Sequence, residues 1–152
     1  MKTPLDAAAL KNRVIGLLAR REYSRLELIQ RLRQQAASVS ILNNVLDALE
    51  QDGYLSDQRC AESFIRQRLG QYWGPKRIRY ELQQKGIPAS LINRLLEEAD
   101  PDWDALALNL ATKRFDLSGR ADLKEQAKRL RYLVNYGFSY DQAQRALKTD
   151  LM

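Results

Sequence analysis

The amino-acid sequence predicts an all-α protein built as a tandem array of three three-helix, helix-turn-helix-like repeats. Apolar residues recur every three or four positions along almost the whole chain, and no long stretch alternates apolar and polar residues. One helix-ending motif also occurs twice, about fifty residues apart: Leu82 to Ile87 and Leu133 to Phe138 each place a glycine ten residues before a leucine. A period of this length is typical of helical arrays, so we expect an elongated molecule whose overall shape can be curved.

The first repeat is predicted over residues 1–56. A helix from Asp6 to about Arg21 precedes a capping box, in which Ser24 accepts from an early backbone N–H and Glu27 reaches back to Ser24. A short polar segment, 34–40, lacks the glycine of the later repeats, and a third helix ends at Gly53. The predicted core residues of this repeat are Leu10, Val14, Leu17, Leu18, Leu28, Ile29, Leu32, Ile41, Leu42, Val45, Leu46 and Leu49.

The second repeat is predicted over residues 57–100. Gly74 breaks the chain and Pro75 restarts it, because proline suits the first turn of a helix, where its missing N–H is not needed. Gly86 ends that second helix and Pro88 opens the third. The predicted core residues are Cys60, Ala61, Phe64, Ile65, Leu69, Ile78, Leu82, Ile92, Leu95 and Leu96.

The third repeat is predicted over residues 101–152. We interpret Asp100 as the N-cap of its first helix and Pro101 as a first-turn residue. A loop at 116–122 follows this helix, and a second capping box, Ser139 to Gln142, opens the last helix. The predicted core residues are Trp103, Leu106, Ala107, Leu110, Ala111, Leu130, Leu133, Val134, Ala143, Ala146 and Leu147.

The charge of the chain favours an anionic partner. The net charge is +6 and the isoelectric point is near 9.6. Each predicted repeat has two more basic than acidic residues, so the charge repeats with the fold. A single cysteine and no recognisable secretion signal lead us to expect a cytoplasmic protein, and no apolar run approaches the roughly twenty residues that a membrane span needs. We expect a monomer as the simplest state.

The residues that most enzymes rely on are missing from the sequence. Histidine is absent, Cys60 has no second thiol with which to form a zinc site, and the glycines stand singly at predicted helix ends rather than in a phosphate loop. We interpret the acidic residues between Glu97 and Asp104 as helix-end and solvated groups rather than metal ligands. We therefore expect a non-enzymatic protein with neither cofactor nor metal.

The segment from Arg66 to Arg79 is the strongest candidate contact surface. It holds five basic residues, and no acid lies between Glu62 and Glu81. Guanidinium groups suit phosphates and carboxylates, and the interleaved aromatic residues can stack on exposed bases. The alternative is a solvated helix surface with Trp73 in the core. Over the three repeats, the candidate residues for partner contact are Arg20, Arg21, Arg25, Arg66, Arg68, Trp73, Lys76, Arg77, Arg79, Lys85, Lys128 and Arg131.

Three segments, in order, resemble the bacterial RecX regulators: Leu18 to Leu28, Leu46 to Asp57, and Gly74 to Ile87. The similarity runs from about residue 12 to 149 and is weakest in the third repeat, where Asp102-Trp103 and Gly137-Phe138 are its main anchors. It implies three tandem three-helix repeats and a non-enzymatic protein that binds the RecA recombinase filament. It further implies inhibition of the ATPase, strand-exchange and coprotease activities of RecA, and weak binding to single- and double-stranded DNA.

Two other functions stay open at this point. One is a stand-alone DNA-binding protein, because each predicted repeat has a capped second helix followed by a third helix, as in helix-turn-helix units. The other is a helical scaffold that binds a peptide of some other partner, since a fold alone does not determine function. The resemblance supplies no contact motif, so the candidate residues above rest on local charge.

Overall fold

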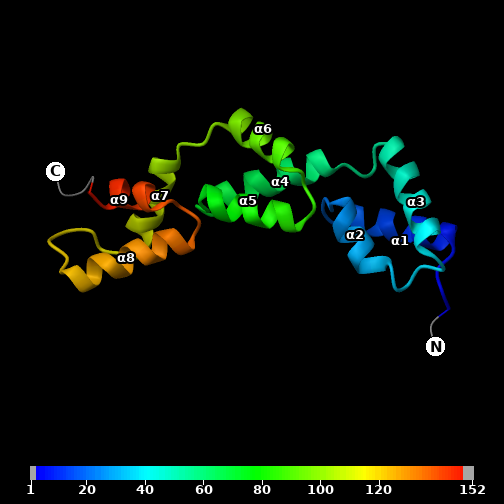
Figure 1. Ribbon diagram of the computed structural model, residues 1–152, viewed down its shortest axis with the longest axis horizontal. Coiled ribbons are helices and arrows are strands. Elements are labelled where there is room, and N and C mark those ends of the chain that lie inside the picture. Colours follow the sequence, from blue (N-terminus) through cyan, green and yellow to red (C-terminus); the bar gives the residue numbers. More distant parts are fainter. Residues whose placement is uncertain (1–2, 149–152) are drawn as a thin grey trace.

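The computed structural model describes residues 3–148, and over that range it contains nine α-helices and no β-strand (Figure 1). The predicted all-α fold is therefore confirmed. The helices form an elongated, arched molecule with the N-terminal helices at one end and the C-terminal helices at the other. They are α1 (Ala7–Leu18), α2 (Arg25–Leu32), α3 (Val39–Gln51), α4 (Asp57–Gly70), α5 (Pro75–Gln84), α6 (Ala89–Ala99), α7 (Trp103–Arg114), α8 (Leu123–Asn135) and α9 (Tyr140–Lys148).

Helix ends follow the local capping chemistry that the sequence predicts. At the start of α2 the backbone N–H of Glu27 donates to Ser24 Oγ over 3.1 Å, and the Ser24 N–H donates to Glu27 Oε1 over 3.0 Å. Ser139 and Gln142 exchange the same pair of hydrogen bonds at the start of α9. Gly86 follows α5 with a φ of +82°, a conformation that glycine adopts without strain.

The start of α7 differs from the sequence interpretation. Asp102, not Asp100, is the N-cap, because its carboxylate accepts from the backbone N–H of Ala105 over 3.0 Å. Asp100 instead ends α6 in the left-handed conformation, with a φ of 45°. Pro101 lies before the cap and not in the first turn. Two helix-end signals overlap in this short segment, and the residue pattern alone does not separate them.

The helices pack around three apolar clusters, one for each group of three helices. The first helix of each group contacts the third: α1 lies on α3, α4 on α6, and α7 on α9. The buried members of the clusters are Leu10, Val14, Leu17, Tyr23, Leu28, Leu32, Leu42, Val45, Leu46, Leu49 and Leu55; then Ala61, Phe64, Ile65, Ile78, Leu82, Ile87, Ile92, Leu95 and Leu96; then Ala107, Leu110, Ala111, Leu133, Phe138, Ala143 and Ala146.

Two features of these clusters correct or extend the predicted cores. Val134 was expected in the third core but is 41% exposed, since it lies about 100° around the helix from its buried neighbour Leu133. Conversely, four buried residues outside the helical stripes were not predicted: Tyr23, Leu55, Ile87 and Phe138. The remaining predicted core residues are buried or partly buried.

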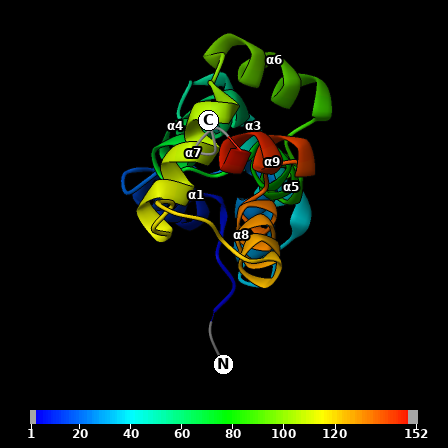
Figure 2. The same cartoon turned by 90° about the vertical axis from the view of Figure 1, so that its left-hand side faces the viewer.

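The second helices of the three groups lie end to end along the molecule, in the order α8, α5, α2. The C-terminal end of α8 meets the N-terminal end of α5, where the N–H of Gly74 donates to Tyr136 O over 2.7 Å. The C-terminal end of α5 meets the first turn of α2, where Lys85 pairs with Glu27 over 3.0 Å. Figure 2 looks along the molecule from the C-terminal end, with the third group of helices nearest the viewer.

The repeated glycines close these junctions. A Cβ on Gly86 would lie 2.8 Å from Leu26 Cβ on α2, and a Cβ on Gly137 would lie 2.5 Å from Arg77 Cβ on α5. Each glycine therefore ends its own helix, and its missing Cβ leaves room for the first turn of the next helix in the row. That helix is α2 beside Gly86 and α5 beside Gly137. At the corresponding end of α2, Leu5 exchanges backbone hydrogen bonds with Gln35 and Ala37.

Candidate functional site

The twelve candidate residues fall into two sets, according to whether their side chains already contact other residues of the protein. Six have side-chain partners within the protein: Arg21, Arg25, Arg68, Trp73, Arg77 and Lys85. The other six are exposed and make no side-chain hydrogen bond, ion pair or ring contact with any described residue: Arg20, Arg66, Lys76, Arg79, Lys128 and Arg131.

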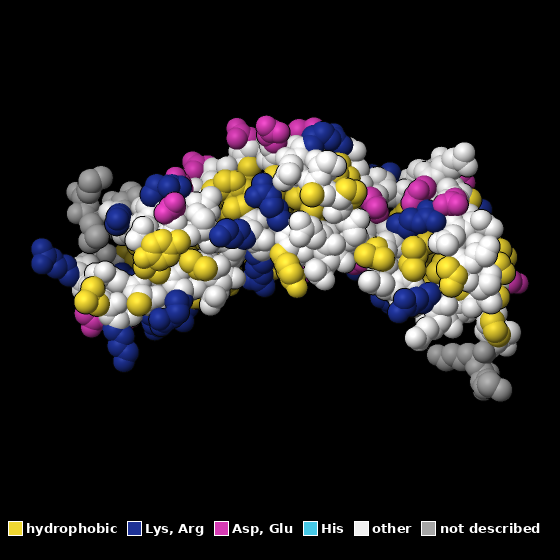
Figure 3. Space-filling model, viewed as in Figure 1, with side chains coloured by type: hydrophobic (Ala, Val, Ile, Leu, Met, Phe, Trp, Pro, Cys, Tyr) yellow, Lys and Arg dark blue, Asp and Glu magenta, His cyan; other side chains and the backbone are white. Residues whose placement is uncertain are grey.

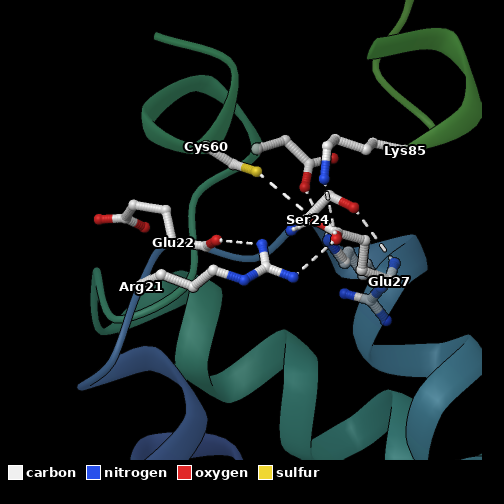
Figure 4. A network of polar contacts seen from close by, with 8 residues as sticks. Arg21, Glu22, Ser24, Glu27, Cys60 and Lys85 are labelled. Atoms are coloured by element: carbon white, nitrogen blue, oxygen red, sulfur yellow. Dashed lines mark hydrogen bonds and ion pairs between the residues drawn. The ribbon is translucent and has the colours of Figure 1, made fainter. Parts of the chain in front are cut away.

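Lys85 and Arg21 converge on Glu27 where the first and second groups of helices meet (Figure 4). Lys85 Nζ lies 3.0 Å and Arg21 Nη2 lies 3.1 Å from Glu27 Oε2, while the other carboxylate oxygen caps α2. Burial alone raises the pKa of Glu27, but the hydrogen bonds from the Ser24 N–H, Lys85 and Arg21 outweigh it and lower that pKa. Glu27 therefore stays ionised, and both cations are occupied.

Cys60 lies at the same junction and behaves as a buried thiol. Its Sγ is 3.8 Å from Glu27 Oε1, and only 3% of the residue is exposed. Burial, together with the negative charge of Glu27, raises the pKa of the Cys60 thiol to about 12. A thiol held in this way is a poor nucleophile, because the thiolate is the reactive form.

Arg25 ties α2 to α3. Its Nη1 lies 2.7 Å from Asp47 Oδ1 and 3.1 Å from Glu50 Oε1, and its Nη2 donates to the carbonyl of Asn43 over 3.2 Å. Only 25% of the Arg25 side chain is exposed. These contacts make it an internal brace of the first repeat.

Trp73 is covered by arginines at the junction of the second and third groups. The guanidinium of Arg77 lies 3.7 Å and that of Arg68 lies 4.4 Å from the centroid of the Trp73 ring. The ring packs against the second core and meets Phe64 edge-on, with 6.1 Å between ring centroids. Arg77 also lies 5.6 Å from the ring of Tyr136. The stack engages Trp73 within the protein, which supports the interpretation of this residue as core.

Unengaged cations stand at helical spacing on α5 and α8, and others, such as Lys11, Arg31 and Arg33, lie elsewhere on the molecule. Lys76 and Arg79 are three residues apart on α5, and Lys124, Lys128 and Arg131 follow each other at spacings of four and three on α8. Residues at these spacings share one face of a helix. We call Lys76, Arg79, Lys124, Lys128 and Arg131 the cationic edge; Lys124 is likewise exposed and without a side-chain partner among the described residues.

The two stripes of the cationic edge adjoin, because α8 ends where α5 begins. The N–H of Lys76 donates to Gly137 O, just beyond the end of α8, over 2.9 Å. Figure 3 shows Lys and Arg side chains projecting from the lower edge of the molecule below α8, whereas acidic side chains gather along the upper edge over α6. Exposed acids at the end of α6 include Glu97, Glu98 and Asp100. In this view, cations therefore mark the lower edge of the third repeat, and acidic side chains are concentrated over α6.

The part of the chain that the structure describes offers no cluster of three His, Cys, Asp or Glu side chains able to hold a metal ion. Within the same part, every helix is too short or too polar to cross a membrane. What the arrangement does offer chemically is a row of guanidinium and ammonium groups, which bind phosphates or carboxylates.

Sequence reasoning found the cations but not which of them are occupied. Lys85 and Glu27 are 58 residues apart, so no local pattern indicates their ion pair. Arg77 and Arg79 look alike in sequence, yet one stacks on Trp73 and the other faces solvent. The sequence did carry one usable local signal: Trp73 lies just before α5, and Arg77, four residues later, lies in the first turn of that helix.

Two family models match the chain. One, described as RecX, second three-helix domain, matches residues 56–96, and the other, RecX, third three-helix domain, matches residues 102–147. Together they span more than half of the 152 residues. Their borders lie close to those of the second and third groups of helices.

Several sequences named as RecX proteins are similar over nearly their whole length. A protein of Chromohalobacter salexigens named Regulatory protein RecX is 42% identical over 145 residues, which are 95% of this chain and 91% of that protein. One of Pseudomonas putida strain GB-1 with the same name is 38% identical over 148 residues, which are 97% of this chain and 95% of that protein.

Two solved structures share the fold. The crystal structure of RecX from Lactobacillus salivarius superposes with a TM-score of 0.81 at 24% identity, covering 97% of this chain and 98% of that one. A second crystal structure, of regulatory protein RecX, gives a TM-score of 0.79 at 24% identity and covers 91% and 71% of the two chains. Both likenesses confirm the tandem helical architecture.

Proposed function

Because the chain belongs to the RecX family of regulatory proteins, we propose that it is a non-enzymatic regulator of the RecA recombinase filament on DNA. In this proposal it inhibits the ATPase, strand-exchange and coprotease activities of RecA. It acts in the cytoplasm as a monomer. The observation that carries the proposal is the cationic edge, five exposed basic side chains that the described part of the chain leaves without partners.

The shape of the array suits a polymeric partner. A nucleoprotein filament repeats the same subunit surface and the same phosphate backbone along its length. The cationic edge spans two repeats, so one molecule can make several weak contacts at once. Joined weak contacts add through effective concentration, without any single strong site. Basic side chains on such an edge meet DNA phosphates or acidic protein surface in the filament.

Direct DNA binding without RecA is the alternative. The side-chain-capped second helices of the first and third repeats and the cationic edge both favour it, whereas α5 begins at Gly74 without a side-chain cap. A binder that acts through phosphates alone loses DNA affinity steeply with salt, with a log–log slope of about 0.7 to 0.9 for each phosphate neutralised. A salt titration of DNA binding without recombinase therefore separates the two functions.

The decisive experiment measures the single-strand-dependent ATPase of RecA with increasing amounts of this protein. A filament regulator lowers the steady-state rate at protein concentrations well below that of RecA subunits, and it lowers strand exchange in parallel. A stand-alone DNA binder inhibits only when it covers the DNA. Unchanged ATPase and strand exchange at stoichiometric protein would rule the proposal out.

A further inference from the structure

The array has two joints, one between each pair of neighbouring groups of helices. The second joint, where α4–α6 meet α7–α9, is a contact between backbones. The N–H of Gly74 donates to Tyr136 O over 2.7 Å, and the N–H of Lys76 donates to Gly137 O over 2.9 Å. A Cβ on Gly74 would lie 2.2 Å from the carbonyl carbon of Gly137, so these two backbone segments are in direct contact. Trp103 packs against both the second and the third core. Opening this joint would exchange two backbone hydrogen bonds for hydrogen bonds to water and would expose an apolar contact.

The first joint, where α1–α3 meets α4–α6, is held mainly by side chains. Its ion pairs are Lys85 with Glu27 at 3.0 Å and Arg59 with Glu22 at 3.2 Å. The Arg25 N–H also donates to the carboxylate of Asp57 over 2.8 Å. Among the described residues, no backbone-to-backbone hydrogen bond joins these two groups of helices, and their cores share no residue.

Each joint has one buried polar atom without a hydrogen-bond partner among the described residues: Glu22 Oε2 at the first joint and Arg68 Nε, beside Trp73, at the second. A buried carboxylate oxygen without a donor disfavours the closed arrangement, because water would bind that oxygen in the open one. Gly53, with a φ of +83° and no atom within 4 Å of a Cβ placed on it, lies in the link between the two groups.

We propose that the array bends at the first joint while the second joint stays closed. The side chains of Glu27, Lys85, Arg59 and Glu22 then separate, and each group of helices keeps its own core. Ion pairs weaken as salt screens them, whereas backbone hydrogen bonds and apolar contacts do not depend on salt in this way. Bending is therefore promoted by ionic strength. It is a property of the chain alone and does not depend on the proposed function.

Two natural reporters distinguish the joints. Cys60, the single cysteine of the sequence, is 3% exposed, belongs to none of the three core clusters, and touches Glu27 across the first joint. The two tryptophans, Trp73 and Trp103, both lie at the second joint. The rate of thiol alkylation therefore reports on opening of the first joint, and tryptophan emission reports on opening of the second.

The test is the alkylation rate of Cys60 by N-ethylmaleimide, an uncharged reagent, in wild type and Lys85→Gln. Burial raises the pKa of Cys60, and the charge of Lys85 partly lowers it, so removing that charge in a closed joint leaves less thiolate and slows the reaction. In a joint that opens, the same substitution exposes the thiol more often. We expect alkylation to be roughly two- to fivefold faster in Lys85→Gln, since one partly buried ion pair is lost.

The matched control is Gly74→Ala, which perturbs the second joint; because this variant is also less stable overall, alkylation is compared with wild type under conditions where circular dichroism shows both proteins fully folded. We expect Gly74→Ala to shift tryptophan emission while Cys60 reacts at the wild-type rate. In wild type, added salt should speed alkylation with tryptophan emission and far-ultraviolet circular dichroism constant. Slower or unchanged alkylation of a folded Lys85→Gln variant would overturn the proposal. So would alkylation that appears only together with loss of the tryptophan signal, which indicates global unfolding.

Discussion

Gly74 and Gly137 show how single residues set the shape of this array. Both are buried, and their backbones meet where α5 follows α8. Gly137 has a φ of +103°, a region that side-chain-bearing residues rarely adopt, and its missing Cβ makes room for Arg77. Gly137 O accepts a hydrogen bond from the N–H of Lys76, a member of the cationic edge. The two glycines act by bringing the two stripes of the cationic edge together.

Gly74→Ala should therefore be strongly destabilising. We expect a loss of more than about 2 kcal/mol in the free energy of unfolding, because a methyl group has no space and two backbones must separate. Gly16→Ala is the matched control: Gly16 lies inside α1 with nothing within 4 Å of a Cβ, and alanine there should stabilise by roughly 0.5–1 kcal/mol. Urea denaturation of both variants measures this. Equal effects would show that the Gly74 contact is not structural.

Glu27 makes a pH-dependent contribution to stability. Its pKa in the folded protein is lowered, so the folded state favours the ionised carboxylate. The stabilisation is therefore complete above the ordinary glutamate pKa of about 4.3 and is lost as the pH falls through the lower folded value. Glu27→Gln keeps an oxygen for the Ser24 N–H and removes only the charge.

We expect Glu27→Gln to be less stable than wild type at pH 7 by about 1 kcal/mol, a value reduced for partial exposure of the ion pairs. The two proteins should converge in stability as the pH drops below about 4. Chemical denaturation at a series of pH values gives both curves. A difference that stays constant down to pH 3 would mean that the charge of Glu27 does not stabilise the fold.

At the scale of whole elements, α8, α5 and α2 form a discontinuous row in which the C-terminal end of each helix contacts the N-terminal end of the next. The helix dipole makes an N-terminus partly positive and a C-terminus partly negative, so the contacts in this row join opposite charges. At the first of them, between α8 and α5, backbone N–H groups at the N-terminal end of α5 donate to carbonyls at the C-terminal end of α8. Lys85, at the C-terminal end of α5, meets Glu27 in the first turn of α2. The row is thus held by matched end charges as well as by the glycines.

The sequence predicted the elements well because their signals are local. Capping boxes at Ser24 and Ser139, Pro75 in a first turn and glycines after helices all involve residues within a few positions of each other. The relation between elements was not predictable in this way. Gly86 looks like a simple helix end, and only the fold shows that Leu26, sixty residues earlier, fills the space above it.

The same limit applies to the candidate site. Charge along the chain identified every member of the cationic edge on α5, but it could not separate Arg79, which is exposed, from Arg77, which covers Trp73. Occupancy depends on what a side chain meets in three dimensions. Lys85 is the clearest case, since its partner Glu27 comes from another repeat.

The corrected start of α7 gives a test at this scale. Asp102→Ala should lower the stability of the third group of helices by about 1 kcal/mol, the usual cost of losing an N-cap acceptor. Asp100→Gly should be neutral or slightly stabilising, because glycine adopts the left-handed conformation of residue 100 without strain. Thermal unfolding of the two variants distinguishes them. The reverse order of stability would restore Asp100 as the cap.

At the scale of the whole molecule, the essential property is an edge of cations held along a curved array and opposed by an acidic edge over α6. The arrangement of the helices determines the direction and spacing of the charged side chains, and the two joints determine how rigidly the repeats hold them. Cations at the joints contact other residues of the protein, whereas those of the cationic edge on α5 and α8 are free to contact a partner. Function then depends on where charge lies and not only on how much there is.

The most direct test compares two charge reversals of equal size in the RecA ATPase assay. Lys76→Glu with Arg79→Glu changes the cationic edge, and Lys11→Glu with Arg13→Glu makes the same change in net charge on α1. Both pairs are exposed. We expect the α5 variant to need a roughly five- to tenfold higher concentration for half-inhibition, and the α1 variant to inhibit like wild type. Equal inhibition by both folded variants would contradict the account.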